Sequence, residues 1–348
     1  MPDSRSVSET PTNVANSSLG TWFQRHKDKI WWLHSLYALV FGIGIMWLGA
    51  RNYNFLRVTV FHVGFIWLTS LYLPKLLAHP WLPALWAPRL RWFINYFNKN
   101  FYQQVLFFVL PIYYASATLS SANSAFVLAL GISAIVSTLD IVYDRHLSAR
   151  QSLTAVFFAF NLFALINVML PVLWSVSNLW ATRLSAVLAG VAFATLYRPI
   201  FEPRRLRIEF GLLTVVAMLA VAEYGRLFIP PAPLRLISAQ FGSGFDREAM
   251  RAEPILRKLE VGRGVRVWGV TAIRAPLGLR EQVQHRWFQN GKLIWASPFY
   301  DVTGGRERGF RLWTTCTFDN IAAGTELRLD VATEGGQLIG RANLRAAR

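Results

Sequence analysis

Residues 153–174 read LTAVFFAFNLFALINVMLPVLW, a run of 22 residues without a charged side chain. A helix of this length is about 33 Å long at about 1.5 Å per residue, which matches the roughly 30 Å hydrocarbon core of a bilayer. A second apolar run, residues 179–197, follows after a short turn. The two runs together predict a hairpin of transmembrane helices.

Comparable apolar runs occur on both sides of this hairpin. They predict a membrane all-α domain of about seven transmembrane helices within residues 30–229. The expected spans are 31–50, 57–77, 104–121, 123–142, 153–174, 179–197 and 210–229.

The overall composition agrees with a membrane protein. Of 348 residues, 53% are hydrophobic and only 16% are charged, which excludes a purely soluble globular protein and a disordered chain. The single cysteine, Cys316, excludes an intrachain disulfide and a cysteine-rich metal site.

The net charge of +17 is distributed unevenly along the chain. Lys and Arg concentrate in the segment before the first span and in every second loop, and this bias predicts the cytoplasmic side. We therefore expect residues 1–29 to form a disordered cytoplasmic tail and the C-terminus to be periplasmic, in a multi-pass protein of a bacterial inner membrane. Because the basic residues follow a membrane face, the lipid bilayer is the expected partner and nucleic acid is not.

The character of the sequence changes after residue 229. Three prolines at 230, 231 and 233 end the last apolar run, and we expect residues 230–263 to be a linker. Residues 264–348 contain short alternating segments separated by glycine pairs, and Asn290-Gly291 is a strong hairpin signal. This pattern predicts an all-β, immunoglobulin-like sandwich.

Several short motifs in this region carry a family resemblance. They are His285-x-Trp287, Asn290-Gly291-Lys292, Arg311-Leu312-Trp313-Thr314-Thr315, Gly324 and Gly336-Gln337-Leu338-Ile339-Gly340-Arg341. Over residues 265–345 the chain resembles an envelope β-domain of unknown function found at the C-termini of proteobacterial inner-membrane proteins. The apolar region resembles the uncharacterised family in which that domain occurs. The β-region departs from the pattern of the domain after Gly324, where Thr325-Glu326-Leu327 stands in place of a segment that often begins with an aromatic residue. The resemblance implies no activity and no cofactor.

Polar residues inside the apolar runs form one candidate site, because ionisable and amide side chains in a membrane are functional suspects. Glu223 and Arg226 are three residues apart in the last span, and Asn161 and Asn167 lie in the fifth. A small-solute transporter or permease using these four residues is the alternative function. Asp140 and Asp144, one helical turn apart, are weak metal-ligand candidates.

Aromatic and basic residues of the β-region form the second candidate site, a binding face for a periplasmic protein or a glycan. Since no catalytic motif is present, we expect a non-enzymatic membrane protein that displays a binding module. The face comprises Trp268, His285, Trp287, Trp295, Arg306, Arg308 and Trp313.

Overall fold

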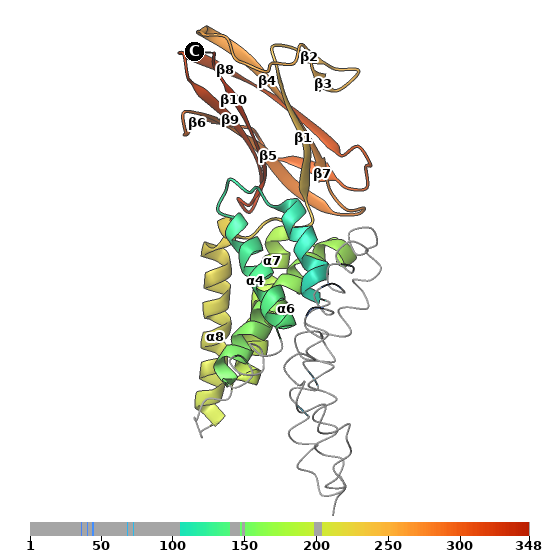
Figure 1. The fold of residues 1–348 in the computed structure, drawn as a ribbon, viewed down its shortest axis with the longest axis vertical. Coiled ribbons are helices and arrows are strands. Elements are labelled where there is room, and N and C mark those ends of the chain that lie inside the picture. The colour runs from blue at the N-terminus through green and yellow to red at the C-terminus, as the bar shows by residue number, and fades with distance from the viewer. Residues whose placement is uncertain are drawn as a thin grey trace, which may run out of the picture.

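The computed structural model describes residues 105–139, 147, 150–197 and 204–347, together with the isolated positions 36, 40, 44, 68 and 72. The described chain has two parts, a group of helices and a β-sandwich stacked on one end of it (Figure 1). The C-terminus lies at the end of the sandwich that is remote from the helices.

The described helical part contains five α-helices and one short 3-10 helix. The sandwich-proximal ends of the helices are joined by tight turns, and the last helix leads directly into the first strand. The helices are Val105–Ser116, α4 (Ser124–Thr138), α6 (Gln151–Trp174), α7 (Asn178–Leu196) and α8 (Arg204–Tyr224), followed by η2 (Arg226–Phe228).

The prediction of about seven transmembrane helices is wrong. Among the described residues only α6 and α7 are long and apolar enough to cross a membrane. Helix Val105–Ser116 and α4 are shorter, and α8 begins six residues before the predicted span, so that its first two turns carry three arginines and Glu209. The predicted spans 31–50 and 57–77 and the tail 1–29 lie outside the described residues, apart from isolated positions.

The helices pack through small residues and large apolar side chains. Gly190 of α7 lies so close to Val215 of α8 that a Cβ on the glycine would be 2.8 Å from the Val215 Cα. Such small-residue contacts let two helix backbones approach closely. Helix α6 packs against helix Val105–Ser116, where Phe158 and Leu165 of α6 lie in one buried cluster with Tyr113.

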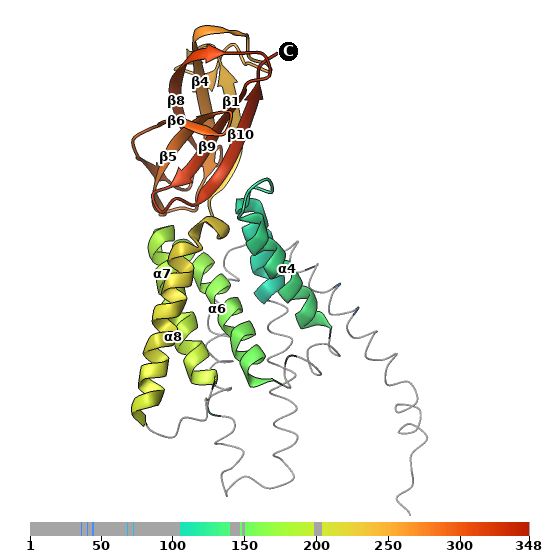
Figure 2. The same cartoon turned by 90° about the vertical axis from the view of Figure 1, so that its left-hand side faces the viewer.

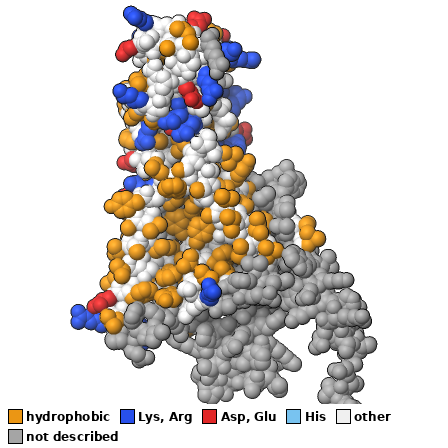
Figure 3. All heavy atoms as spheres, turned by 60° about the vertical axis from the view of Figure 1, so that its left-hand side comes forward, with side chains coloured by type: hydrophobic (Ala, Val, Ile, Leu, Met, Phe, Trp, Pro, Cys, Tyr) orange, Lys and Arg blue, Asp and Glu red, His pale blue; other side chains and the backbone are white. Residues whose placement is uncertain are grey.

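The outer surface of the helical part is strongly apolar. Leu213 and Val221 of α8 are 67% and 69% exposed, and Trp174 and Trp180 are exposed at the sandwich-proximal ends of α6 and α7. Figure 3 shows hydrophobic side chains gathered over the helices, whereas most of the Lys, Arg, Asp and Glu side chains in view lie on the sandwich. An apolar surface of this extent requires a cover other than water.

Besides a separate two-stranded sheet of β2 and β3, the C-terminal part contains two antiparallel sheets that pack face to face. One sheet has the strand order β1-β4-β8, and the other has the order β10-β9-β5-β6, with β7 also paired to β5. Strand bounds are β1 (Arg235–Gly242), β2 (Phe245–Asp246), β3 (Arg251–Ala252), β4 (Gly262–Arg274), β5 (Arg280–Gln289), β6 (Lys292–Ala296), β7 (Tyr300–Thr303), β8 (Phe310–Ile321), β9 (Glu326–Thr333) and β10 (Leu338–Arg345).

Segment 230–263 is not a linker, because it contains β1, β2 and β3. Strand β1 pairs with β4 along most of its length and adds Phe241 to the core beside Trp287. At the edge of its sheet, β1 also meets β10 of the opposite sheet, where Leu236 packs against Gly340. This contact closes one side of the sandwich.

The sandwich stands on one end of the helical part (Figure 2), and hydrogen bonds join the two parts. Asn123, just before α4, donates its side-chain amide to the Leu338 carbonyl, and Gln337 donates to the Ile229 carbonyl. The Glu281 carboxylate accepts the backbone N–H of Asn178 at 2.7 Å. These bonds join the sandwich to the ends of three helical segments.

Candidate functional site

The side of the sandwich opposite the β1–β10 contact is open. A cleft of about 440 Å³ lies there between the β8 edge of one sheet and the β6–β7 edge of the other. Half of its lining residues are aromatic, namely Trp295, Tyr300, Phe310 and Trp313. The cleft therefore offers a largely apolar surface between two sheet edges.

Strand β6 presents an exposed edge beside this cleft. Among the described strands it pairs only with β5, and all five of its residues are exposed. Leu293 and Ile294 are 48% and 42% exposed, although both are aliphatic. A short, uncovered edge strand has backbone N–H and C=O groups available to a further strand.

An aromatic stack flanks the cleft on the outer face of the β1-β4-β8 sheet. Phe245 stacks on Trp313 with ring centroids 4.8 Å apart, and on Trp268 at 5.6 Å. Arg311 donates to the carbonyls of Ala249 and Met250, which fixes the β2–β3 hairpin loop over this face. Each of the three rings is therefore in contact with the other two, which occupies part of its surface within the protein, while Trp313 remains 37% exposed.

His285 and Trp287 belong to the core and not to a binding face, since both are 0% exposed. The His285 ring lies 2.8 Å from the hydroxyls of Thr271 and Thr314, and Trp287 donates its indole N–H to Thr314 at 2.9 Å. Burial lowers the pKa of His285 to about 3, so the ring is neutral at physiological pH. This network links the two sheets and satisfies its own polar atoms.

The remaining predicted residues of the binding face are dispersed. Trp295 and Trp313 line the cleft, and Trp268 lies in the adjacent stack. Arg306 and Arg308 are exposed in the turn before β8, and the Arg306 guanidinium lies 5.5 Å from the centre of the Phe310 ring. Sequence reasoning missed Tyr300 and Phe310, because the pairing of β7 with β5 places Tyr300 and the pairing of β8 with β4 places Phe310.

Glu223 and Arg226, the predicted polar pair of the last helix, form an ion pair of 2.9 Å. Glu223 also pairs with Arg183 of α7 at 3.2 Å, and Arg183 in turn lies over the Trp180 ring. The carboxylate therefore ties the sandwich-proximal ends of α7 and α8 together. Sequence spacing does not reveal Arg183, since it lies on another helix.

Asn161 and Asn167 are both buried in α6, but their surroundings differ. Asn167 donates to the Tyr113 hydroxyl at 3.0 Å and accepts from Thr182 at 3.1 Å, which connects three helices. The side-chain amide of Asn161 is buried without a hydrogen-bond partner in the described part of the chain. Among the described residues, no hydrogen bond connects either asparagine to Glu223 or Arg226. The four predicted residues therefore do not form one site.

The metal-ligand candidates Asp140 and Asp144 lie outside the described residues. Within the described segments, no three His, Cys, Asp or Glu side chains are grouped as metal ligands.

A match to a known protein family covers the helical part and the first strands of the sandwich. No protein with a curated description matches the chain. One protein family does, and its sequence model covers residues 13–270, which is well over half of the chain and ends within β4. All of the motifs from His285 onwards lie beyond that match. The chain therefore belongs to DUF5924, a family of unknown function.

Proposed function

We propose that the chain is an integral membrane protein that displays its β-sandwich outside the bilayer as a binding module. The partner is an extended segment of another protein, which adds to the β6 edge and places side chains in the aromatic cleft. The observation that carries the proposal is the open side of the sandwich, where an exposed aliphatic edge strand borders an apolar cleft.

Three features support placement of the helical part in a membrane. Helices α6 and α7 have the length and composition of spans. The exposed side chains of α8 are apolar over most of its length. Trp174 and Trp180 lie at the sandwich-proximal helix ends, where indole rings favour the headgroup level of a bilayer.

The orientation follows from the basic residues of the described helices. Arg150, Arg204, Arg205 and Arg207 lie at the helix ends remote from the sandwich. Because cytoplasmic segments carry the excess of Lys and Arg, this end is cytoplasmic in our proposal. The sandwich then lies on the opposite side, the periplasm of an inner-membrane protein.

An extended peptide suits the cleft better than a glycan. A peptide strand can pair with the free edge of β6 through backbone hydrogen bonds, and its alternate side chains can enter the cleft. A glycan platform requires an open ring face, but Phe245, Trp268 and Trp313 stack on one another.

Orientation is tested with cysteines at the two ends of the structure. In a Cys316→Ala background, Lys292→Cys and Gln151→Cys place one thiol on the sandwich and one at the remote end of α6. We expect an impermeant thiol reagent to label only the first in cells with a permeabilised outer membrane. Labelling of Gln151→Cys alone would contradict the orientation.

Partner binding is tested by photo-crosslinking from position 292, next to the cleft. We expect Ile294→Arg to abolish a crosslinked protein adduct, because it places a charge on the β6 edge. The matched control is Ile237→Arg, on edge strand β1 at the closed side, where the residue is similarly exposed. An adduct that survives Ile294→Arg, or binding of glycans alone, would refute a protein partner in the cleft.

A further inference from the structure

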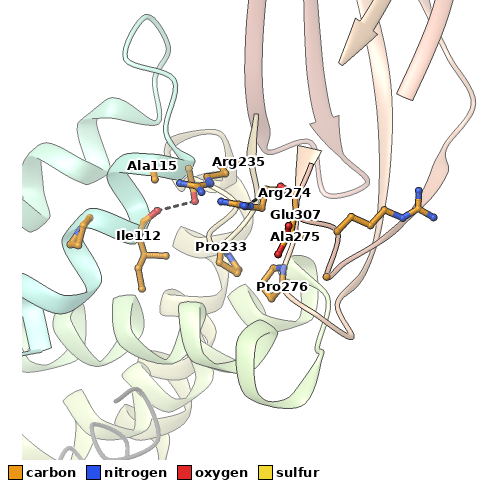
Figure 4. A pocket seen from close by; sticks show the side chains of 12 residues that line it. Ile112, Ala115, Pro233, Arg235, Arg274, Ala275, Pro276 and Glu307 are labelled. Atoms are coloured by element: carbon orange, nitrogen blue, oxygen red, sulfur yellow. Dashed lines mark hydrogen bonds between the residues drawn. The ribbon is translucent and has the colours of Figure 1, made fainter. Parts of the chain in front are cut away.

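A second cavity, of about 380 Å³, lies where the helical part meets the sandwich (Figure 4). One wall is the end of helix Val105–Ser116, with Ile112 and Ala115 facing the cavity. The opposite wall contains Arg235 of β1 and Arg274 of β4, and Arg306 and Glu307 from the turn before β8 complete the lining. The cavity thus has an apolar helical wall and a cationic sandwich wall.

The arginines of this wall lack acidic partners. In the described part of the chain, no carboxylate forms an ion pair with Arg235, Arg274 or Arg306. Arg274 donates to the backbone carbonyl of Glu307 at 3.0 Å, which fixes its position but leaves its charge uncompensated. The Arg306 guanidinium lies over the Phe310 ring. Arg235 and Arg274 bring two positive charges to this space against the single negative charge of Glu307, so the cavity favours an anion.

We propose that this cavity binds the phosphate group of an anionic phospholipid, with Arg235 and Arg274 as the ligands of the phosphate. A guanidinium presents a fork of N–H donors that matches two phosphate oxygens. The proposal rests on the membrane placement proposed above, which sets the sandwich-proximal helix ends at the headgroup level.

The apolar wall selects a lipid over free phosphate. A free ion gains nothing from Pro111, Ile112 and Ala115, whereas the glycerol and upper acyl region of a lipid can lie against the side of the helix. The exposed Trp174 and Trp180 lie at the same end of the helical part as this cavity. The phosphate headgroup would therefore contact the sandwich while the acyl region contacts the helix.

The test compares lipid retention by the full chain in nanodiscs of phosphatidylglycerol and of phosphatidylcholine, measured by native mass spectrometry after release. We expect Arg235→Gln with Arg274→Gln to reduce retained phosphatidylglycerol about tenfold or more, as loss of charge-assisted hydrogen bonds implies. The control is Arg263→Gln, an exposed arginine roughly 36 Å from Arg274 along the same strand.

Each outcome is decisive. Equal retention by the double variant and by the Arg263→Gln control would overturn the site. Millimolar inorganic phosphate that displaces the lipid-dependent signal and binds with equal strength in lipid-free detergent would show a free-phosphate site and overturn the lipid assignment. Incorporation into both nanodiscs without lipid preference refutes only this inference, whereas failure to incorporate into either refutes the membrane placement itself.

Discussion

The carboxylate of Glu281 in β5 accepts two hydrogen bonds from Asn178, the first residue of α7. The backbone N–H lies at 2.7 Å and the side-chain amide at 3.1 Å. The first N–H groups of a helix have no partner within the helix, and a carboxylate there also meets the positive end of the helix dipole. A residue of the sandwich therefore completes the start of a helix in the other part of the protein.

Removing this contact should loosen the junction without unfolding either part. For Glu281→Ala we expect a loss of about 1–3 kcal/mol at the junction, because a buried N–H is left without an acceptor. Glu281→Gln keeps one acceptor oxygen and should have a smaller effect. Hydrogen exchange of the Asn178 amide in the full chain measures both, and equal protection in the wild type and the alanine variant would disprove the role.

The same contact makes the junction sensitive to pH. Burial raises the pKa of Glu281 above its usual range, and the two hydrogen bonds from Asn178 offset this only in part. The folded state holds the proton of Glu281 more tightly than the unfolded chain does. Protonated Glu281 therefore contributes stability that is fully present below the unfolded pKa of about 4.3 and is lost as pH rises through the raised pKa. We expect the protection factor of the Asn178 amide, which corrects its exchange rate for the intrinsic pH dependence of exchange, to fall over that window in the wild type and to stay level in Glu281→Gln.

His285 gives the sandwich the opposite dependence on pH. Its pKa falls to about 3 in the folded protein from an ordinary value of 6.5, because burial disfavours the charged ring. As pH falls, the unfolded chain binds a proton at His285 before the folded protein does. The stability contributed by neutral His285 is therefore fully present above pH 6.5 and is lost as pH falls towards 3. The expected loss is about 1.4 kcal/mol per pH unit.

Denaturant unfolding of the full chain, followed by tryptophan fluorescence between pH 7 and 4, measures this slope. The control is His285→Gln, which keeps hydrogen-bonding capacity but does not titrate in this range. A variant with the same acid slope as the wild type would show that other groups cause the loss.

Most strands of the sandwich were predictable because their sequences alternate. The Asn290-Gly291 turn is confirmed, since both residues adopt the positive φ that a two-residue hairpin turn requires. Strand β1 was missed because its sequence, RLISAQFG, follows three prolines and does not alternate cleanly. Its place is decided by pairing with β4 and contact with β10, which are tertiary relationships.

The candidate sites were predictable only as residue types. Alternation along β5 places His285 and Trp287 on one face, but cannot say that this face is the core. The cleft depends on two edges from different sheets, and the arginine cavity on residues from β1, β4 and a turn. The helix count failed for a related reason, because apolar composition does not show where a helix ends.

Gly340 should be the least tolerant position on the closed side of the sandwich. A Cβ there would lie 2.5 Å from both Cβ and Cδ2 of Leu236, so Gly340→Ala should destabilise the protein by about 1–3 kcal/mol. Leu236→Gly removes both of these atoms and should relieve the clash, and the double variant should be more stable than the sum of the single effects predicts. Additive effects in denaturant unfolding would show that β1 and β10 do not meet here.

The two asparagines of α6 should respond in opposite directions to the same substitution. Asn167→Leu breaks the connection from Tyr113 to Thr182 and should cost about 1 kcal/mol. Asn161→Leu removes a buried amide that has no partner in the described chain and should stabilise the protein by about 1 kcal/mol or more. Thermal unfolding of both variants in one detergent provides the comparison. Destabilisation by Asn161→Leu would mean that this amide has a polar partner in the native membrane protein, and would return it to consideration as a site.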